Sequence, residues 1–211
     1  MEMKPSESML ALGECYFPEA VVTNTPDIAA PGVSVPTLSA PPFRLRPIAM
    51  TDLDLVREAS GDPHIPLITT VPTVFSESEG VAFIERQWSR ARLGQGYPFV
   101  IAEATTDRGV GVIGLMLRNI DEGRASLGYW VVQSARGRSA ATHALRTVAA
   151  WALGELGIPR LELFVPPTNT ASIVTAERCG FRREGLLRAW QQVGTERWDM
   201  LAYSRLPGEV P

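Results

Sequence analysis

The change of pattern between residues 127 and 165 constrains the fold more than any other feature of the sequence. A β-branched run at Tyr129–Gln133 leads into small and polar residues at Ser134–Ala141, and a second apolar run lies at Leu161–Val165. This order predicts a strand, a tight turn, a helix and a second strand. The helix is expected to begin at Ala140 and to bury residues that recur at three- and four-residue spacing, namely Ala141, Ala144, Leu145, Val148, Ala152 and Leu156.

A strand followed by such a turn and a helix predicts an anion-binding site. The first N–H groups of a helix lack backbone acceptors, and the helix dipole places partial positive charge at the same end. Arg136 and Arg138 add two formal charges within the turn. We therefore expect a phosphorylated ligand there. Taken alone, the turn is explained equally well as a packing turn of small residues.

The rest of the chain alternates between strand and helix patterns, which predicts an α+β domain. Turn residues separate the apolar runs that predict strands. The expected strands are Phe43–Pro47, Tyr97–Ala104, Val110–Leu117, Ala125–Gln133, Phe181–Trp190 and Glu196–Arg205. The run Gly109–Gly114 matches a dinucleotide-binding glycine pattern, but a strand follows where that motif requires a helix, so we reject such a site.

Helix caps mark three further helices. Thr51 is expected to cap a helix that stops at Gly61, and Ser76 opens a capping-box pattern for a helix that ends at Gly94. A third helix is expected at Thr170–Arg178. The stretch Asp62–Phe75 has no strong period and is expected to be irregular.

Composition excludes several classes of protein. The chain has 211 residues, which suits one domain, and its net charge of −3 argues against a general nucleic-acid grip. No apolar run approaches the ~20 residues that span a bilayer, and no secretion signal is evident. The cytoplasm is therefore the expected location. His64 and His143 have no partners at metal-ligand spacing, and two cysteines form no metal or disulfide framework, so we expect no metal.

Two motifs resemble those of the GNAT N-acetyltransferases. Arg136-Gly137-Arg138-Ser139-Ala140-Ala141 resembles the R/Q-x-x-G-x-G/A pyrophosphate loop, with Ser139 in place of its first glycine. Asn169–Ser172 and Glu177–Gly185 resemble the N-x-x-S…E-x-x-G-F-x-x-E-G signature of one branch. That RimJ/RimL-like branch contains enzymes that acetylate ribosomal-protein N-termini. Serine still offers its backbone N–H, so we expect weaker optimisation of the loop rather than its loss.

The resemblance also covers the start of the domain and implies its fold. Phe43–Pro47, followed by Thr51 and Asp52, resembles the opening strand and helix cap of the branch. The implied GNAT fold has a mixed, mostly antiparallel sheet with helices on both faces. Its strands ending near Gln133 and starting near Leu161 splay apart, and the pantetheine arm of acetyl-CoA lies in the gap. The expected divisions are an extension of unknown role at 1–34, with a short strand near Ala20–Thr23, the acetyltransferase domain at 35–206 and a tail at 207–211.

The resemblance assigns acetyl-CoA as co-substrate and implies the residues that bind it. Backbone N–H groups from Arg138 to Ala141 would hold the pyrophosphate, with charge from Arg136 and Arg138. Asn169 would contact the cofactor arm, although it also reads as the N-cap of the helix that follows. Ser172 would donate a proton to the departing thiolate, or it is simply a solvent-facing residue. The backbone around Val131 and Val132 is the expected oxyanion donor.

No residue stands out as the general base. By resemblance, the branch can carry a glutamate where this chain has Gln191, and glutamine accepts no proton at neutral pH. Glu103 and Glu196 acting through water are the substitutes, unless no base is used. An amine of modest pKa then makes the better acceptor: at pH 7.5, deprotonating a lysine amine costs about 4 kcal/mol, and deprotonating an α-amine costs less than about 1 kcal/mol.

The acceptor site is expected to involve His64, Trp190 and Gln191. His64 lies in the irregular stretch, and the other two lie at the expected tip between the last strands, where they are as well explained by hairpin packing. The predicted function is acetyl transfer to a primary amine of a peptide N-terminus or small molecule, without nucleic-acid or membrane partners. A non-catalytic acyl-CoA-binding module and an antibiotic-modifying enzyme are the alternatives, and homodimerisation through the extension stays open.

Overall fold

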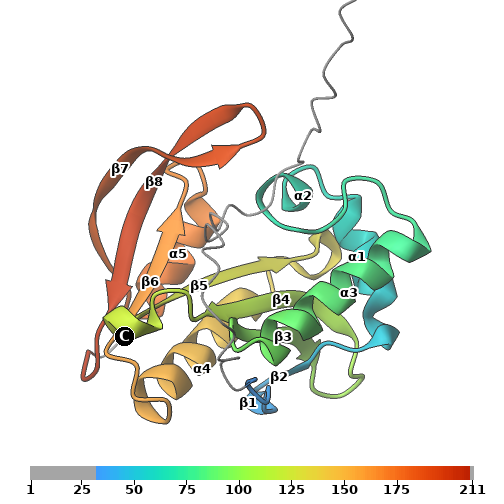
Figure 1. The fold of residues 1–211 in the computed structure, drawn as a ribbon, viewed down its shortest axis with the longest axis horizontal. Helices are drawn as coiled ribbons and strands as arrows, with labels where there is room; N and C mark the ends of the chain where they lie inside the picture. Colours follow the sequence, from blue (N-terminus) through green and yellow to red (C-terminus); the bar gives the residue numbers. More distant parts are fainter. Residues whose placement is uncertain (1–31, 210–211) are drawn as a thin grey trace, which may run out of the picture.

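The computed structural model describes residues 32–209, so nearly all of the expected N-terminal extension, including the strand near Ala20–Thr23, lies outside the described part. Figure 1 shows the sheet with its helices. The strands are β1 (Leu38–Ala40), β2 (Phe43–Pro47), β3 (Gly96–Glu103), β4 (Gly109–Met116), β5 (Arg124–Val131), β6 (Arg160–Val165), β7 (Arg182–Val193) and β8 (Glu196–Arg205). The α-helices are α1 (Leu53–Ser60), α2 (Ile65–Ile68), α3 (Glu77–Arg92), α4 (Ala140–Gly154) and α5 (Thr170–Arg178). The described residues also include the short 3₁₀ helices η1 (Met50–Asp52), η2 (Ile120–Glu122) and η3 (Gln133–Ala135).

Between residues 32 and 209, eight strands form one mixed sheet in the order β1-β2-β3-β4-β5-β6-β8-β7. All neighbours are antiparallel except β5 and β6, which are parallel. The parallel pair is joined by α4, as a crossover connection requires. The predicted fold, a mostly antiparallel mixed sheet in the GNAT arrangement, is confirmed.

The parallel pair separates partway along its length. Pairing between β5 and β6 begins at Arg124 with Arg160 and ends at Ser126 with Glu162. Beyond that point β5 stays paired with β4 as far as Val131. β6 stays paired with β8 as far as Val165. The two strands therefore open a gap in the sheet, at the place where the splay was expected.

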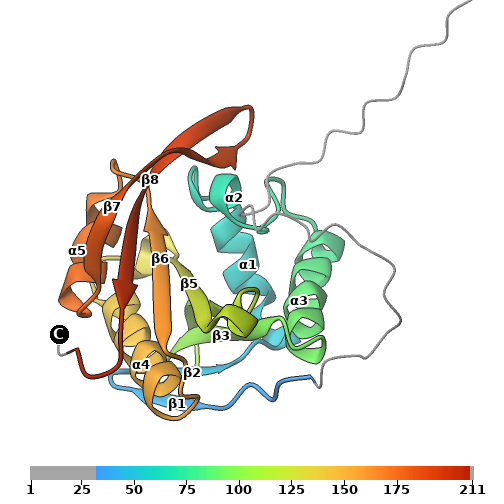
Figure 2. The same cartoon turned by 60° about the vertical axis from the view of Figure 1, so that its left-hand side comes forward.

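Helices cover both faces of the sheet, as predicted. α4 and α5 lie on one side, and α1 and α3 lie on the other (Figure 2). Trp151 of α4 packs edge-on against Tyr97 and Phe99 of β3, with ring centroids 4.9 and 5.8 Å apart. The buried face of α4 follows the expected spacing, except that Ala141 is half-buried and Leu156, which lies beyond the helix end, is 37% exposed.

The start of α1 differs from the expected cap. Thr51 is exposed and does not cap the helix, and the prediction for this residue is wrong. Asp52 holds the N-cap position of α1, but its side chain caps no N–H of that helix. Its Oδ2 accepts the N–H of Ala49, just before η1, at 2.8 Å. Asp52 also accepts two hydrogen bonds of 2.8 Å from Arg46, so this buried carboxylate fixes β2 against the start of α1.

Two other segments were not expected. β1 adds a three-residue edge strand before β2, and α2 forms a helical turn inside the stretch predicted to be irregular. β7 also continues past Trp190 to Val193, so the hairpin tip lies at Gly194 and Thr195. The expected placement of Trp190 and Gln191 at the tip is therefore wrong: both belong to the strand.

Candidate active site

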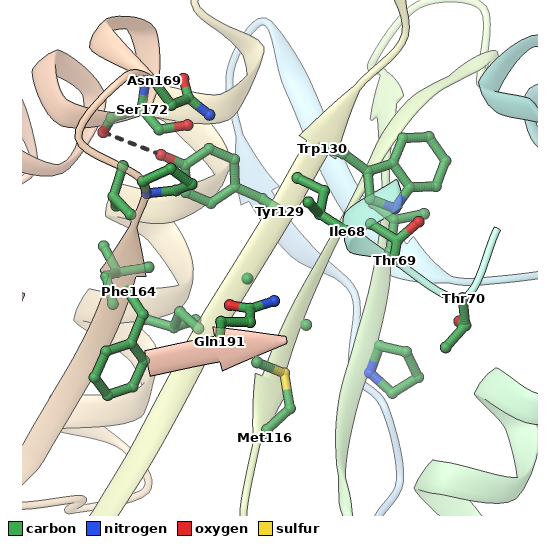
Figure 3. Close-up of a pocket in the computed structure, with 18 of the residues that line it drawn as sticks. Ile68, Thr69, Thr70, Met116, Tyr129, Trp130, Phe164, Asn169, Ser172 and Gln191 are labelled. Carbon is green, nitrogen blue, oxygen red and sulfur yellow. Dashed lines mark hydrogen bonds between the residues drawn. The ribbon is translucent and has the colours of Figure 1, made fainter. Parts of the chain in front are cut away.

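A cavity of about 160 Å³ lies beside the gap between β5 and β6. Its wall combines Thr69 and Thr70 after α2 with Tyr129 of β5, and Figure 3 shows Gln191 of β7 reaching across it. Ser172 at the start of α5 also lines it. Segments far apart in the sequence thus meet at the splay, which makes the cavity the candidate reaction site.

Within residues 32–209, the backbone of β5 presents N–H groups without a backbone partner to this gap. The N–H of Val132 donates to the carbonyl of Val110 at 3.0 Å, so Val132 faces β4. Successive residues of an antiparallel ladder alternate in direction, and therefore the N–H groups of Val131 and Tyr129 face the gap. Of the two expected oxyanion donors, the geometry favours Val131. Tyr129 supplies a second N–H that the sequence analysis missed.

The turn before α4 has the shape of an anion-binding loop. Gly137 and Ser139 have φ values of 78° and 59°, in the left-handed region. The N–H groups of Arg138, Ser139, Ala140 and Ala141 donate to no acceptor within residues 32–209. Several free N–H groups at a helix N-terminus, in a loop with left-handed residues, match the requirements of a pyrophosphate. This observation supports the fit of acetyl-CoA to the loop.

Arg136 does not extend freely from the loop. Its Nη2 donates to the buried Asp62 at 2.5 Å, and its Nε donates to the carbonyl of Val131 at 3.1 Å. Asp62 also accepts the N–H groups of His64 and Ile65, at 2.9 and 3.0 Å, and so caps α2. Arg136 therefore connects the loop at residues 136–141, the candidate cofactor loop, to α2, whose C-terminal end lies in the cavity wall. The sequence signal for this carboxylate was its position just before a Pro-containing helical turn.

Arg138 is, like Arg136, an exposed cation of this loop. Its Nη1 donates to Glu103 at 2.6 Å, and its guanidinium lies 5.9 Å from the ring centre of Phe43. Hydrogen bonds from Thr106 and Arg138 lower the pKa of Glu103 below 4.5. Glu103 is thus an ionised partner at the cofactor loop, and it does not line the cavity.

Asn169 and Ser172 lie together at the start of α5. The Oδ1 of Asn169 accepts the N–H of Ser172 at 3.1 Å, which is the expected N-cap. Both residues line the cavity. The hydroxyl of Tyr129 donates to the carbonyl of Ser172 at 3.4 Å (Figure 3), and burial raises the pKa of Tyr129 to about 12. Tyr129 is a functional candidate that sequence reasoning missed, because strand tyrosines most often serve packing.

The expected acceptor residues occupy different places. Gln191 lines the cavity. Trp190 is 52% exposed outside the lining and stacks on Phe164, which does line it, with centroids 5.8 Å apart. His64 is exposed at the start of α2, and the other end of that helix, not His64, reaches the cavity. Glu196 lies on the exposed hairpin near Trp198 and likewise does not line the cavity.

Within residues 32–209, His, Cys, Asp and Glu form no group of three arranged to hold a metal ion. The one cysteine in this range, Cys179, is buried, and its Sγ donates to the carbonyl of Thr142 at 3.4 Å. None of the helices between residues 32 and 209 has the length and hydropathy needed to cross a bilayer.

Comparison with known proteins points to one family. Residues 43–182 match the model of the acetyltransferase (GNAT) domain. The chain is 26% identical over 173 residues to the uncharacterized N-acetyltransferase p20 of Bacillus licheniformis, covering 82% of this chain and 97% of that protein.

Solved structures share the fold. RimJ of Mycobacterium smegmatis, in complex with CoA-disulfide, is 27% identical with a TM-score of 0.72, covering 84% of this chain and 88% of that one. RimL, a ribosomal L7/L12 α-N-protein acetyltransferase in complex with coenzyme A, is 18% identical with a TM-score of 0.68, covering 81% and 98%.

Asp62→Asn is expected to lower the free energy of unfolding by about 1–3 kcal/mol at pH 7, because it weakens a charge-assisted hydrogen bond to Arg136. Burial raises the pKa of Asp62, but hydrogen bonds from His64, Ile65 and Arg136 outweigh it and lower the pKa below 3.8. The stabilisation is therefore complete above the unfolded pKa of about 3.9 and is lost as pH falls through the lower folded value.

Urea unfolding of both proteins between pH 3 and pH 7 tests this expectation, and the difference should shrink at the acid end. Asp54→Asn is the matched control, because Asp54 is exposed on α1 and, among residues 32–209, its ion pair is with Arg57 alone. A difference that stays constant with pH would contradict the assigned role of the Asp62 charge.

Ser139→Gly is expected to raise stability by up to about 1 kcal/mol, because a residue with a side chain is disfavoured at φ 59° and glycine is not. The serine hydroxyl makes no capping hydrogen bond that would be lost. Thermal unfolding measures the change. Ser134→Gly is the control, since Ser134 is not in the left-handed region, and it should be neutral or destabilising. A lower midpoint for Ser139→Gly would refute the strain.

Proposed function

Because the chain belongs to the GNAT acetyltransferase family, and is therefore an acyltransferase, we propose that it transfers an acetyl group from acetyl-CoA directly to an uncharged primary amine. The observation that carries this proposal is the alignment of three features: free N–H groups at the start of α4, unpaired β5 backbone in the gap, and a cavity where the gap ends. These features match a pyrophosphate, an extended arm and a reacting acyl group, in that order.

The cofactor loop provides both donors and charge. N–H groups from Arg138 to Ala141 hold the pyrophosphate, and Arg138 exchanges Glu103 for a phosphate oxygen. Arg136 keeps its contacts with Asp62 and Val131 and holds the loop in place. The gap-facing backbone of Tyr129 and Val131 bonds the pantetheine arm as an added strand does.

The reaction places its own demands on the cavity. When bound, acetyl-CoA supplies a thioester carbonyl that the neutral amine attacks. A C–N bond forms and the C–S bond breaks, the thiolate takes up a proton, and the new amide loses one. The N–H of Val131 stabilises the developing oxyanion. Ser172 donates the proton to sulfur and regains one through water from the proton that leaves the amide nitrogen. Tyr129 stays protonated near neutrality and supports Ser172 through its carbonyl.

The base is water or the solvent rather than a side chain. Neither Glu103 nor Glu196 lines the cavity, and Gln191, which does, accepts no proton at neutral pH. An amine must then arrive neutral, which favours an α-amine of pKa about 8 over a lysine amine of pKa about 10.4. The acceptor is accordingly a peptide N-terminus or a small α-amine. The RimL neighbour, a ribosomal L7/L12 α-N-protein acetyltransferase, agrees with this choice.

Coenzyme A release should be at least about 100-fold faster, as kcat/KM at pH 7.5, for an α-amine than for a lysine ε-amine, because about 3 kcal/mol separates their deprotonation costs. The measurement uses the amide of alanine and Nα-acetyl-lysine amide, with purified protein and acetyl-CoA. A preference for the ε-amine near neutrality would contradict the proposal. Absence of coenzyme A binding in calorimetry would remove its basis.

Ser172→Ala is expected to lower kcat at least tenfold and to leave the KM for acetyl-CoA nearly unchanged, because the hydroxyl acts on the leaving thiolate. Steady-state kinetics with Thr170→Ala as control test this, since Thr170, two residues before Ser172, is exposed and does not line the cavity. Unchanged turnover would remove Ser172 from this role. Tyr129→Phe would then decide whether the phenol donates the proton.

A further inference from the structure

The acceptor side of the cavity is apolar, with few charged groups. Met116, Phe83 and Ile68 contribute apolar surface, and Thr69, Thr70 and Gln191 contribute uncharged polar groups. The one charged side chain in the described lining is Arg90, whose Nη1 donates to Gln87 at 2.9 Å. A positively charged group elsewhere on the acceptor molecule would therefore lose its hydration beside an arginine, and it would meet no carboxylate in this lining.

β7 is irregular where it crosses this cavity. Leu187 pairs with Met200 and Gln191 pairs with Trp198, so β7 advances four residues while β8 advances two. Two residues are thus extra in β7, and Ala189 adopts φ 48°, a costly value for a residue with a side chain. We call Arg188–Trp190 the β7 bulge.

Two side chains of β8 hold the β7 bulge. Asp199 accepts the N–H of Ala189 through Oδ1 at 2.7 Å. Arg197 donates to the carbonyl of Ala189 at 2.7 Å and to the carbonyl of Trp190 at 3.0 Å. Three backbone groups of the bulge are therefore satisfied by charged partners, and these bonds offset the strain at Ala189.

The β7 bulge determines which residue faces the cavity. Residues paired across an antiparallel ladder share a face, so Gln191, opposite Trp198, shares a face with the cavity-lining Met200. In a regular ladder Gln191 would pair two positions further along, about 7 Å nearer the hairpin tip. The bulge draws Gln191 back over the cavity, and it places Trp190 against Phe164.

We propose that the acceptor is an α-amine whose neighbouring side chain is uncharged and apolar, and that Arg197 and Asp199 are positioning residues that set this preference by holding Gln191 across the cavity. The inference rests on the proposed function, since it takes the cavity as the acceptor site. It adds the chemical class of the acceptor and two residues outside the cavity lining that position its wall.

The test of acceptor class compares leucinamide, lysinamide and spermidine with the full-length protein. Leucinamide should show a kcat/KM at least tenfold above lysinamide, and spermidine should be the poorest. Equal rates for leucinamide and lysinamide, or a preference for spermidine, overturn the acceptor class. Calorimetry with coenzyme A separates the two proposals. If coenzyme A binds and an amine is acetylated, equal rates or a preference for spermidine reject this inference alone, and the proposed function stands.

The test of the β7 bulge uses Asp199→Ala and Asp199→Asn. Asp199→Ala removes the oxygen that accepts the N–H of Ala189. The KM for leucinamide should therefore rise at least fivefold, while the KM for acetyl-CoA stays within twofold. Asp199→Asn keeps an oxygen at Oδ1 and should restore near wild-type values, which a general loss of folding would not allow. Arg197→Met, which keeps the length of the side chain and loses its donors, should repeat the effect of Asp199→Ala.

Thermal unfolding of each variant is the control that tests whether the fold is retained. If Asp199→Ala and Arg197→Met both keep the wild-type KM for leucinamide, the positioning role is rejected. If both variants raise the KM values for leucinamide and acetyl-CoA by the same factor, the role is rejected as well, because a wall of the acceptor site acts on one substrate.

Discussion

The site depends on a single interruption of backbone pairing. Strands β5 and β6 share only three paired positions before each continues with a different neighbour. Backbone groups that a regular sheet would satisfy are left facing a gap, and buried unpaired groups are costly unless a ligand takes them up. The sheet thereby exchanges some of its own hydrogen bonding for a place that fits an extended arm.

A second constraint links the two ends of that gap. Asp62 caps α2, which reaches the cavity wall, and binds Arg136 of the cofactor loop, which in turn binds the end of β5. One buried carboxylate therefore fixes three segments that are distant in sequence. The loop at residues 136–141 and the cavity wall after α2 are therefore linked through the hydrogen bonds of Asp62 and Arg136.

Much of the fold follows from local patterns. Strand β2, helix α5 and strand β8 have the bounds that the sequence predicts, because apolar alternation, caps and turn residues all lie within each segment. The cofactor loop and the places of Asn169, Ser172 and Gln191 around the cavity were also within reach of motif reasoning, and their chemical roles stay predictions. Two other features depend on contacts that no local pattern shows. Asp62 needs Arg136, 74 positions later, and Tyr129 matters because of α5. The β7 bulge contains no glycine to signal it, and its stability comes from side chains on β8.

The same bulge has an effect outside the chemistry. Among the strands of residues 32–209, β7 is an edge strand of the sheet, next to β8 only. Its outer edge therefore carries the unpaired backbone groups with which a strand of another chain can pair. A kink at Ala189 and the exposed arginines Arg182, Arg183 and Arg188 give that edge the wrong shape and charge for a straight incoming strand. The distortion that turns Gln191 toward the cavity thus also disfavours the pairing of another chain with the outer edge of β7.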